Sequence, residues 1–393
     1  MTWVLLFLIV VAALLPALLA RHRSIERKRL FAIVILVGVI KPLSTILIPF
    51  LVKEDGFGSA MDYYLILLFT YYFFIFLVYR LAISLISNLR SIQLTQFIRP
   101  KPYKYLVFGF AFLFFAVLVL GSGGTFLTNP REGYQYHREG IGFIWVFYIL
   151  SIGILYFIYL IIGRPSFIKI IVFSMAMFFS GSKQLILEIF LKSYLVYTWK
   201  DIRISKFQLM IVGAVFFMLM LKQFDQFGAE EQFLSRVALY FDFMYHASLV
   251  FNDYESGILQ YQFGSIFLSS FWRYVPRVVY PEKPYAYGST SLVEMYFPGL
   301  AETGHTPSFG MLTAEFVDFG WLAPVFAILL NLETLIQILS LVIVTSMNTL
   351  NQRLKIGALA FVLIPGFGFH LPLPITLTVA YFILPSMIRR YSS

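Results

Sequence analysis

Residues 141–162 read IGFIWVFYILSIGILYFIYLII, an unbroken apolar run without a charged side chain. As an α-helix rising ~1.5 Å per residue, such a run is long enough to cross the ~30 Å hydrocarbon core of a bilayer. The run therefore predicts a membrane-spanning helix, and the rest of the chain can be compared with it.

Similar runs recur along all 393 residues, of which 60% are hydrophobic and 13% charged, with a mean hydropathy of +0.81. Soluble proteins are about 45–50% apolar and about 25% charged, so this composition excludes a water-soluble fold. We predict an all-α, polytopic integral membrane protein, with residues 1–393 forming a single membrane domain of about 11 transmembrane helices (10–12). The predicted spans are residues 2–19, 30–52, 63–78, 105–120, 141–162, 167–180, 185–199, 207–221, 322–344, 356–370 and 375–388.

The charges are distributed by loop. The chain carries 30 Lys and Arg against 20 Asp and Glu, a net charge of +10. The basic residues concentrate in alternate loops, among them residues 21–29 and 80–104, and cytoplasmic loops are the ones enriched in Lys and Arg. This pattern places the N-terminus outside and the C-terminus inside, with the first span retained as an anchor. Topology explains the positive charge better than binding to nucleic acid does.

Several chemistries lack their residues or motifs. The sequence has no cysteine, which excludes a disulfide, an iron–sulfur cluster, a Cys-ligated zinc site and a thiol nucleophile. It also contains no zincin, serine-hydrolase or nucleotide-binding motif and no DxD pair. We therefore predict no metal and no cofactor.

Intramembrane charges are sparse and scattered. The clear ones are Lys41, Glu188, Lys192 and Glu333. Glu188 and Lys192 are four residues apart, so they share one helical face and are expected to form a structural pair. A transporter gathers such charges near the bilayer midplane, which this pattern does not show.

Two external segments are longer than turns and are candidate functional loops. The first is residues 121–140, and the second is the large loop of residues 222–307. Within the second, residues 230–251 predict an amphipathic surface helix, on which Arg236, Asp242 and His246 lie nearer to water. Arginines in external loops are unexpected, because Lys and Arg are enriched in cytoplasmic loops. Each external arginine therefore needs an explanation from its own surroundings.

Arg273 and Arg277 have such a reason if they bind an anion, because a guanidinium makes bidentate contacts with phosphate oxygens. Pro276 between them prevents a regular helical pairing, so a bent backbone could aim both at one site. The alternative is that they pair with Glu282 and Glu294 or with lipid headgroups. Both interpretations stay open.

Further candidates lie at the other outer turns. Arg131 is in TNPREGY, residues 128–134, and Lys183 follows Gly181 and Ser182 at the start of a span, where a helix N-terminus favours anions. Lys183 is equally suited to be an interfacial anchor. His305 is expected at the outer mouth of a helix, where it could take a proton from a hydroxyl or serve as a capping residue, and Glu302 is an alternative base in the same turn.

Four motifs carry a family resemblance when taken in order. They are TNPREGY (128–134), SGSK (180–183), WRYVPRVVYPEKPYAYG (272–288) and TGHTPSFGMLTAEFVDFGWLAP (303–324). Together they resemble the O-antigen and oligosaccharide repeat-unit polymerases, the Wzy-type proteins. The third motif favours a polymerase over the related O-antigen ligase, and the scattered midplane charges argue against a lipid-linked oligosaccharide flippase.

The resemblance implies a GT-C-like, metal-independent glycosyltransferase in the bacterial cytoplasmic (inner) membrane. Its donor and acceptor would be polyprenyl (undecaprenyl) diphosphate-linked oligosaccharides, its active site would face the periplasm, and a chain-length regulator would be a further partner. The resemblance implies no nucleic-acid partner. The implied catalytic residues are His305 and Glu302, and the implied diphosphate ligands are Arg131, Arg273, Arg277 and Lys183. Other implied substrate contacts are Arg236, Tyr134, Lys283 and Glu315.

Overall fold

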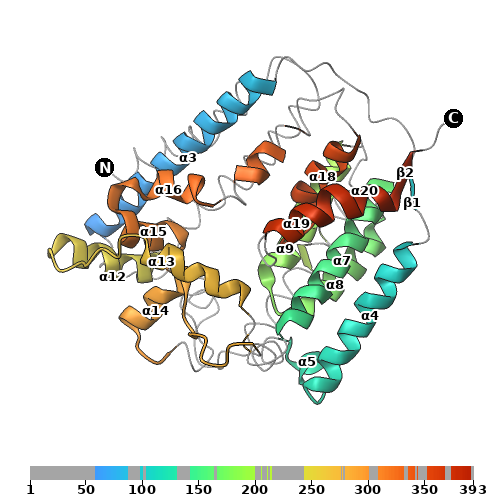
Figure 1. The fold of residues 1–393 in the computed structure, drawn as a ribbon, viewed down its shortest axis with the longest axis horizontal. Helices are drawn as coiled ribbons and strands as arrows, with labels where there is room; N and C mark the ends of the chain where they lie inside the picture. The colour runs from blue at the N-terminus through green and yellow to red at the C-terminus, as the bar shows by residue number, and fades with distance from the viewer. Residues whose placement is uncertain are drawn as a thin grey trace. The chain divides into compact units, whose positions relative to one another are not determined.

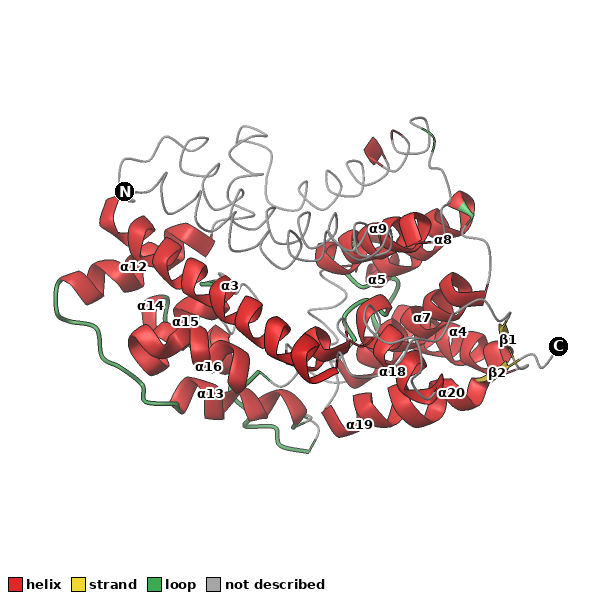
Figure 2. Cartoon of the chain, turned by 90° about the horizontal axis from the view of Figure 1, so that it is seen from above, coloured by secondary structure: helices red, strands yellow, loops and turns green. Residues whose placement is uncertain are grey.

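In the computed structural model, the described part of the chain is helical, apart from one short pair of strands (Figures 1 and 2). It describes residues 58–86, 98–100, 103–130, 142–162, 166–199, 205, 210, 213–214, 243–275, 277, 279–300, 309–331, 335–340, 343, 352–367 and 373–390. The chain divides into two compact units. The first is Met1–Leu81, Gly228–Val275 and Val279–Leu335, and the second is Ala82–Phe227, Pro276–Val278 and Ile336–Ser393.

The first unit is built around the long helix α3 (Gly58–Ile86) and the large loop. Its other elements are α12 (Phe243–Glu255), α13 (Ser265–Ser269), η3 (Ser270–Tyr274), η4 (Gly288–Thr290), α14 (Ser291–Tyr296), α15 (Met311–Phe319), η5 (Gly320–Leu322) and α16 (Ala323–Leu329). Apolar side chains of α3, α12 and α15 form one buried core, in which Tyr64, Phe251 and Phe316 are the largest. Burial of such rings is the main force that holds the large loop against α3.

The second unit holds most of the predicted spans. Its elements are β1 (Ile98–Pro100), α4 (Tyr103–Gly121), α5 (Thr125–Thr128), α7 (Gly142–Ile162), α8 (Phe167–Phe178), α9 (Lys183–Trp199), α18 (Gln352–Leu363), α19 (Leu373–Thr378), the π-helical segment η6 (Val379–Ile383), α20 (Leu384–Met387) and β2 (Ile388–Arg390). Helix α7 is tied to its neighbours by aromatic donors. The indole of Trp145 donates to Ser180 O (3.0 Å), and the Tyr156 hydroxyl donates to Ile189 O (2.8 Å).

Strands β1 and β2 pair antiparallel, with Ile98 opposite Arg390 and Pro100 opposite Ile388. The pairing joins the segment before α4 to the segment after α20. Both segments belong to the basic set of loops that the charge pattern assigns to one side of the membrane. Two segments that pair must lie on the same side, so the pairing is compatible with that assignment.

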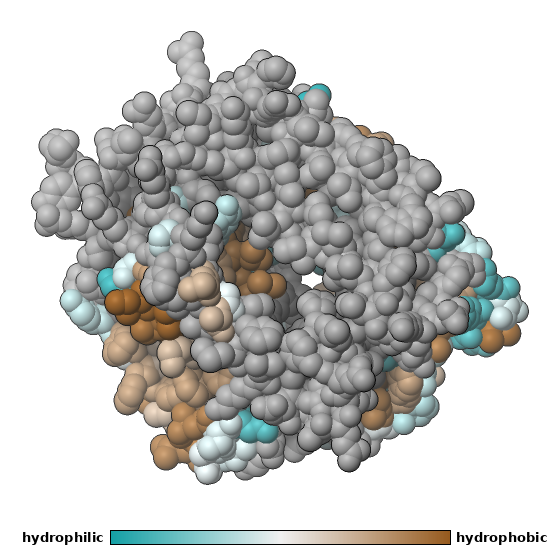
Figure 3. Space-filling view, turned by 180° about the vertical axis from the view of Figure 1, so that it is seen from behind, coloured by the Kyte–Doolittle hydropathy of each residue, from teal (hydrophilic) through white to brown (hydrophobic). Residues whose placement is uncertain are grey.

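Three helices among the described residues are long and apolar enough to cross a membrane, namely Asp62–Ala82, Phe143–Ile161 and Met311–Leu329. The first two match predicted spans. Large apolar side chains on α4 are exposed to the outside, such as Phe108 at 64% and Phe112 at 67%, and apolar surface of the described residues is visible in Figure 3. Such exposed apolar surface is compatible with lipid and not with water. The number of spans along the whole chain stays a prediction.

The stretch Met311–Leu329 is not one straight helix. Gly320 interrupts it with φ of 59°, a conformation that only glycine adopts readily. The rings of Phe319 and Phe326 then stack at 4.3 Å, although seven residues of continuous helix would separate them by about 10 Å. The Asn331 amide reaches the sulfur of Met311 (3.5 Å), so α15 and α16 form a helical hairpin.

The bend at Gly320 lies just before the span predicted at residues 322–344. Helix α16 ends at Leu329, residues 335–340 are helical again, and the amide of Leu335 donates to Asn331 O (3.1 Å). Residues 332–334 lie outside the described residues, so this span stays a prediction. Within the hairpin, the apolar faces of α15 and α16 pack on each other, and Ala323 and Ala327 are almost completely buried. Small side chains allow this close approach between the two helices.

The predicted pair of Glu188 and Lys192 is confirmed, with Lys192 Nζ 2.7 Å from Glu188 Oε2. The pair also binds the turn after α18. Lys192 Nζ donates to Ile364 O (2.8 Å), and the amide of Gly366 donates to Glu188 Oε2 (3.0 Å). The two charges therefore clamp α9 to that turn, which supports the structural interpretation of the pair.

Candidate active site

The structure describes half of the ten predicted site residues. The predicted catalytic and binding residues that lie outside the described residues are Arg131, Tyr134, Arg236, Glu302 and His305. Among the others, Arg273 and Lys183 are described by their backbone, whereas Arg277, Lys283 and Glu315 are described with their side chains. The candidate site is therefore built from the large loop around Arg273.

Arg273 lies in the last turn of a bent helical element. Gly264, with φ of 89°, precedes α13, which continues directly into the 3-10 turn η3. The element ends at Val275, whose φ and ψ of −93° and 112° are extended, and Pro276 follows. Arg277 then lies in a turn. The prediction that Pro276 keeps Arg273 and Arg277 out of one regular helix is confirmed, since a residue before proline avoids the α conformation.

Asp318 of α15 anchors the start of this element. Its side chain is 2% exposed, and its two oxygens accept hydrogen bonds from the amides of Ile266 (3.1 Å, Oδ1) and Phe267 (2.7 Å, Oδ2). These amides belong to the first turn of α13, where backbone donors have no partner within the helix. A negative charge is also favoured at a helix N-terminus. Asp318 therefore fixes the element that carries Arg273.

The sequence did not single out Asp318 for this purpose. Asp318 lies in the fourth motif, just before the span predicted at residues 322–344, and its partners lie 52 and 51 residues away in the chain. A local capping pattern places the acceptor next to the helix that it caps, and here the acceptor comes from a different helix. No signal in a single sequence reports such a contact.

A second contact fixes the far end of the arginine-bearing loop. The amide of Gly288 donates to Ser269 Oγ (2.8 Å), and the Ser269 hydroxyl donates to Ile266 O (2.8 Å). Gly288 has φ of 58°, and a Cβ atom at this position would lie 3.1 Å from Ser270 Cβ. The residue must therefore be glycine for η4 to lie against η3. Both ends of the loop, residues 275 and 287, are held.

Lys283 is engaged inside the same loop. Its ammonium donates to Val275 O (3.0 Å) and lies 4.6 Å from the centroid of the Tyr287 ring. Trp272 and Tyr280 stack at 5.2 Å. These contacts fold the loop back on itself, so Lys283 supports the loop, and its predicted contact with substrate stays a prediction.

Glu315 has an incomplete environment. It is half-buried on α15, one helical turn from Asp318, and its Oε2 atom has no hydrogen-bond partner among the described residues. Buried carboxylate oxygens are normally paired, so this atom is available to a donor such as a sugar hydroxyl. Its contact with substrate remains a prediction. Glu294, the alternative partner considered for the arginines, accepts from the amide of Gly299 (3.0 Å).

Contacts between α12 and α14 shape the rest of the loop. The Tyr296 hydroxyl donates to Asp253 Oδ2 (2.8 Å), and burial raises the pKa of Tyr296, with the hydrogen bond to Asp253 acting in the same direction. His246 packs against the rings of Phe297 (5.6 Å) and Phe309 (5.4 Å). His246 is half-buried, whereas Ala247 and Val250 on the same helix are fully buried. Residues 230–242 lie outside the described residues, so the predicted amphipathic pattern stays a prediction. The described helix begins at Phe243 and ends at Glu255.

In the second unit, α9 begins at Lys183, two residues before the predicted span at 185–199. Gly181 has φ of 70° in the preceding turn, and Ser182 Oγ accepts from the amide of Leu185 (3.4 Å). The turn thus leads directly into a capped helix N-terminus. Among the described residues, no group of His, Cys, Asp or Glu has the arrangement of a metal site.

The fold and the loop define the class as a helical membrane protein with an anchored, arginine-bearing loop. Two curated proteins named O-antigen polymerase, from Salmonella typhimurium and Salmonella typhi, are each 24% identical to the chain over 309 residues, 75% of this chain and 75% of each relative. This similarity confirms, at family level, the resemblance carried by the four motifs. No family model and no solved structure matches the chain.

Proposed function

We propose that the protein polymerises polyprenyl diphosphate-linked oligosaccharide repeat units into O-antigen or a related surface polysaccharide. The similarity to the two Salmonella O-antigen polymerases is the observation that carries this proposal. The apolar helices support a location in a bacterial membrane, where a substrate with a long isoprenoid tail must be held.

The chemistry is a glycosyl transfer. A hydroxyl oxygen of the acceptor unit attacks the anomeric carbon of the donor glycan, and the bond from that carbon to the diphosphate breaks. The diphosphate leaves with the electron pair, while the hydroxyl proton goes to His305 or Glu302. A general base of this kind contributes roughly 10²- to 10⁴-fold to the rate.

Charge stabilisation is the main contribution asked of the protein. Arg273, Arg277 and Arg131 would neutralise the departing diphosphate, with Lys183 assisting, in a metal-independent reaction on the outer face of the membrane. Preorganised donors are effective because they need no reorganisation when the charge develops. The anchoring of η3 by Asp318 supports this use of Arg273, because it fixes the backbone from which the guanidinium extends.

The test uses the full-length protein in lipid vesicles with a defined polyprenyl diphosphate-linked repeat unit. The expected product is a ladder of chains differing by one repeat, formed equally well in the presence of a chelator. A product that appears only when a lipid A core is supplied would identify a ligase. Redistribution of intact substrate across the bilayer without a new linkage would identify a flippase. Either result would overturn the proposal.

A further inference from the structure

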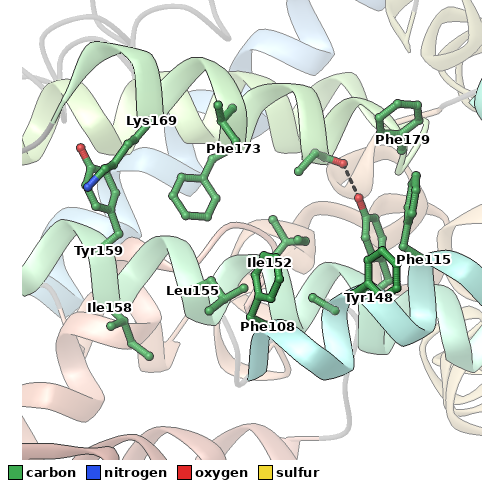
Figure 4. A pocket seen from close by; sticks show the side chains of 14 residues that line it. Phe108, Phe115, Tyr148, Ile152, Leu155, Ile158, Tyr159, Lys169, Phe173 and Phe179 are labelled. Atoms are coloured by element: carbon green, nitrogen blue, oxygen red, sulfur yellow. Dashed lines mark hydrogen bonds between the residues drawn. The ribbon is translucent and has the colours of Figure 1, made fainter. Parts of the chain in front are cut away.

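A groove of about 670 Å³ runs between α4, α7 and α8 of the second unit (Figure 4). Its walls are aromatic and aliphatic, and they include Phe108, Phe115, Ile152, Leu155, Phe173 and Phe179. On α8 the lining residues are 169, 172, 173, 176 and 179, which form one face of the helix. The groove has the size of a small-molecule site, yet it has no convergent set of polar groups.

The two tyrosine hydroxyls in its lining already make hydrogen bonds within the protein. The Tyr148 hydroxyl donates to Ala176 O (2.7 Å), the bond drawn in Figure 4, and the Tyr159 hydroxyl donates to Ser166 O (3.2 Å). A polar occupant would have to leave its own groups unpaired, which is costly. The body of the groove therefore suits a hydrocarbon chain.

One end of the groove carries a charge. Lys169 is exposed there with its ammonium 5.0 Å from the centroid of the Tyr159 ring, and Phe115 and Phe179 lie at the opposite end (Figure 4). The lining residues include no Asp or Glu. The complementary occupant is an amphiphile whose anionic head meets Lys169 while its chain extends toward Phe179.

Two amphiphiles of this kind are a membrane phospholipid and the polyprenyl diphosphate. The length of the groove and the side of the membrane on which Lys169 lies distinguish between them. From Lys169 to Phe179, α8 rises about 15 Å, which is half of the ~30 Å hydrocarbon core and so the depth of one leaflet. Lys169 also follows Arg164 in a basic loop that the charge pattern assigns to the cytoplasmic side, where anionic lipids give the leaflet its negative potential. The polyprenyl diphosphate is proposed to bind at the other face.

We infer that this groove is a binding site for one acyl chain of an anionic phospholipid, with the headgroup on Lys169. The inference goes beyond the proposed function, and it shares with that proposal only the predicted orientation of the chain in the membrane. The preference for an anionic head is expected to be about fivefold, the factor that one lysine near an anionic membrane surface provides.

Photo-crosslinking of the full-length protein in vesicles tests the inference. The probes are phosphatidylglycerol and phosphatidylcholine with the same acyl chain, each carrying a diazirine near the chain end, and adducts are mapped by mass spectrometry. Adducts on α4, α7 and α8 are expected about fivefold more often with phosphatidylglycerol. Lys169→Ala should abolish this preference, and Ala176→Phe, which fills the groove, should reduce adducts from both lipids.

Arg80→Ala is the matched control, because Arg80 is an exposed cation on α3 that does not line the groove. It should leave the adducts in the groove unchanged. Equal labelling by the two lipids in the unmodified protein would overturn the inference, as would the same loss of preference in Arg80→Ala. Displacement of the probe by polyprenyl phosphate at lower concentration than by phosphatidylglycerol would assign the groove to the substrate's tail and would overturn it too.

Discussion

Removing the carboxylate of Asp318 should disable the loop without unfolding the protein. In Asp318→Ala, the amides of Ile266 and Phe267 lose their acceptor in a place where the side chain is 2% exposed. Each hydrogen bond to a charged group contributes about 1.5–3 kcal/mol, and two are lost. We expect a local destabilisation of the α13–η3 element by about 3 kcal/mol or more.

That energy is large for an element of ten residues, so the backbone that carries Arg273 would be held less firmly. If its placement matters in the transition state, a loss of about 3 kcal/mol corresponds to roughly a hundredfold fall in turnover. Asp318→Asn keeps one acceptor oxygen and should fall between the two proteins. The assay is the rate of repeat addition by protein in vesicles, with kcat and KM determined separately.

Thr313→Val is the matched control for this series. Thr313 is fully buried on the same helix, and its hydroxyl has no hydrogen-bond partner among the described residues, so its replacement by the similarly shaped valine removes no hydrogen bond to them. Its rate should equal that of the unmodified protein. If Asp318→Ala adds repeats at the unmodified rate, or if Thr313→Val is equally impaired, Asp318 does not position the loop.

The remaining predictions concern one residue each. Gly288→Ala should lower the midpoint of thermal unfolding and shorten the polysaccharide, since φ of 58° and the approach to Ser270 disfavour a Cβ; unchanged chain lengths would contradict the fixed loop. Lys192→Met removes the ion-pair partner of Glu188 and should increase proteolysis of the turn after α18, whereas adding Glu188→Gln should restore part of the protection. Arg277→Lys and Arg277→Ala should both polymerise more slowly while inserting normally into the membrane, because an ammonium does not reproduce the bidentate contacts of a guanidinium.

The long helices could be predicted from the sequence because a single physical pattern determines them. The run at residues 141–162 corresponds to α7, Gly142–Ile162, and the run at 105–120 to α4, Tyr103–Gly121. The length of the apolar run determines these helices, because a run of about 20 apolar residues spans the hydrocarbon core of the bilayer. Their ends are set by nearby glycine, proline and charge, which the sequence also shows.

Bends within apolar runs were harder to predict. The hairpin of α15 and α16 depends on the positive φ of Gly320, and a glycine in an apolar run is compatible with a straight helix as well. In the last span, the π-helical segment η6 ends two residues before Pro385, which has no amide hydrogen for Tyr381 O. A proline in the sequence is compatible with a kink, a wider π-helical turn or the end of a helix, so Pro385 alone does not predict which of these forms.

The sequence predicted which residue types form the candidate site, but it did not predict the contacts that hold their backbone in place. Arg273 and Pro276 are conspicuous because outer arginines oppose the charge bias of the loops. Asp318 and Ser269 act on them through contacts between distant segments, which only the folded chain brings together. The structure therefore adds the anchoring of the loop, whereas the convergence of the arginines on one diphosphate stays a prediction.

The most direct measurement of the central claim is the stoichiometry between linkages formed and polyprenyl diphosphate released. The full-length protein in vesicles would receive a lipid-linked repeat unit with an isotopic label in the lipid. We predict one polyprenyl diphosphate released for each new glycosidic bond, and loss of both signals in Arg273→Ala. Linkages formed without release of the lipid diphosphate would contradict the account.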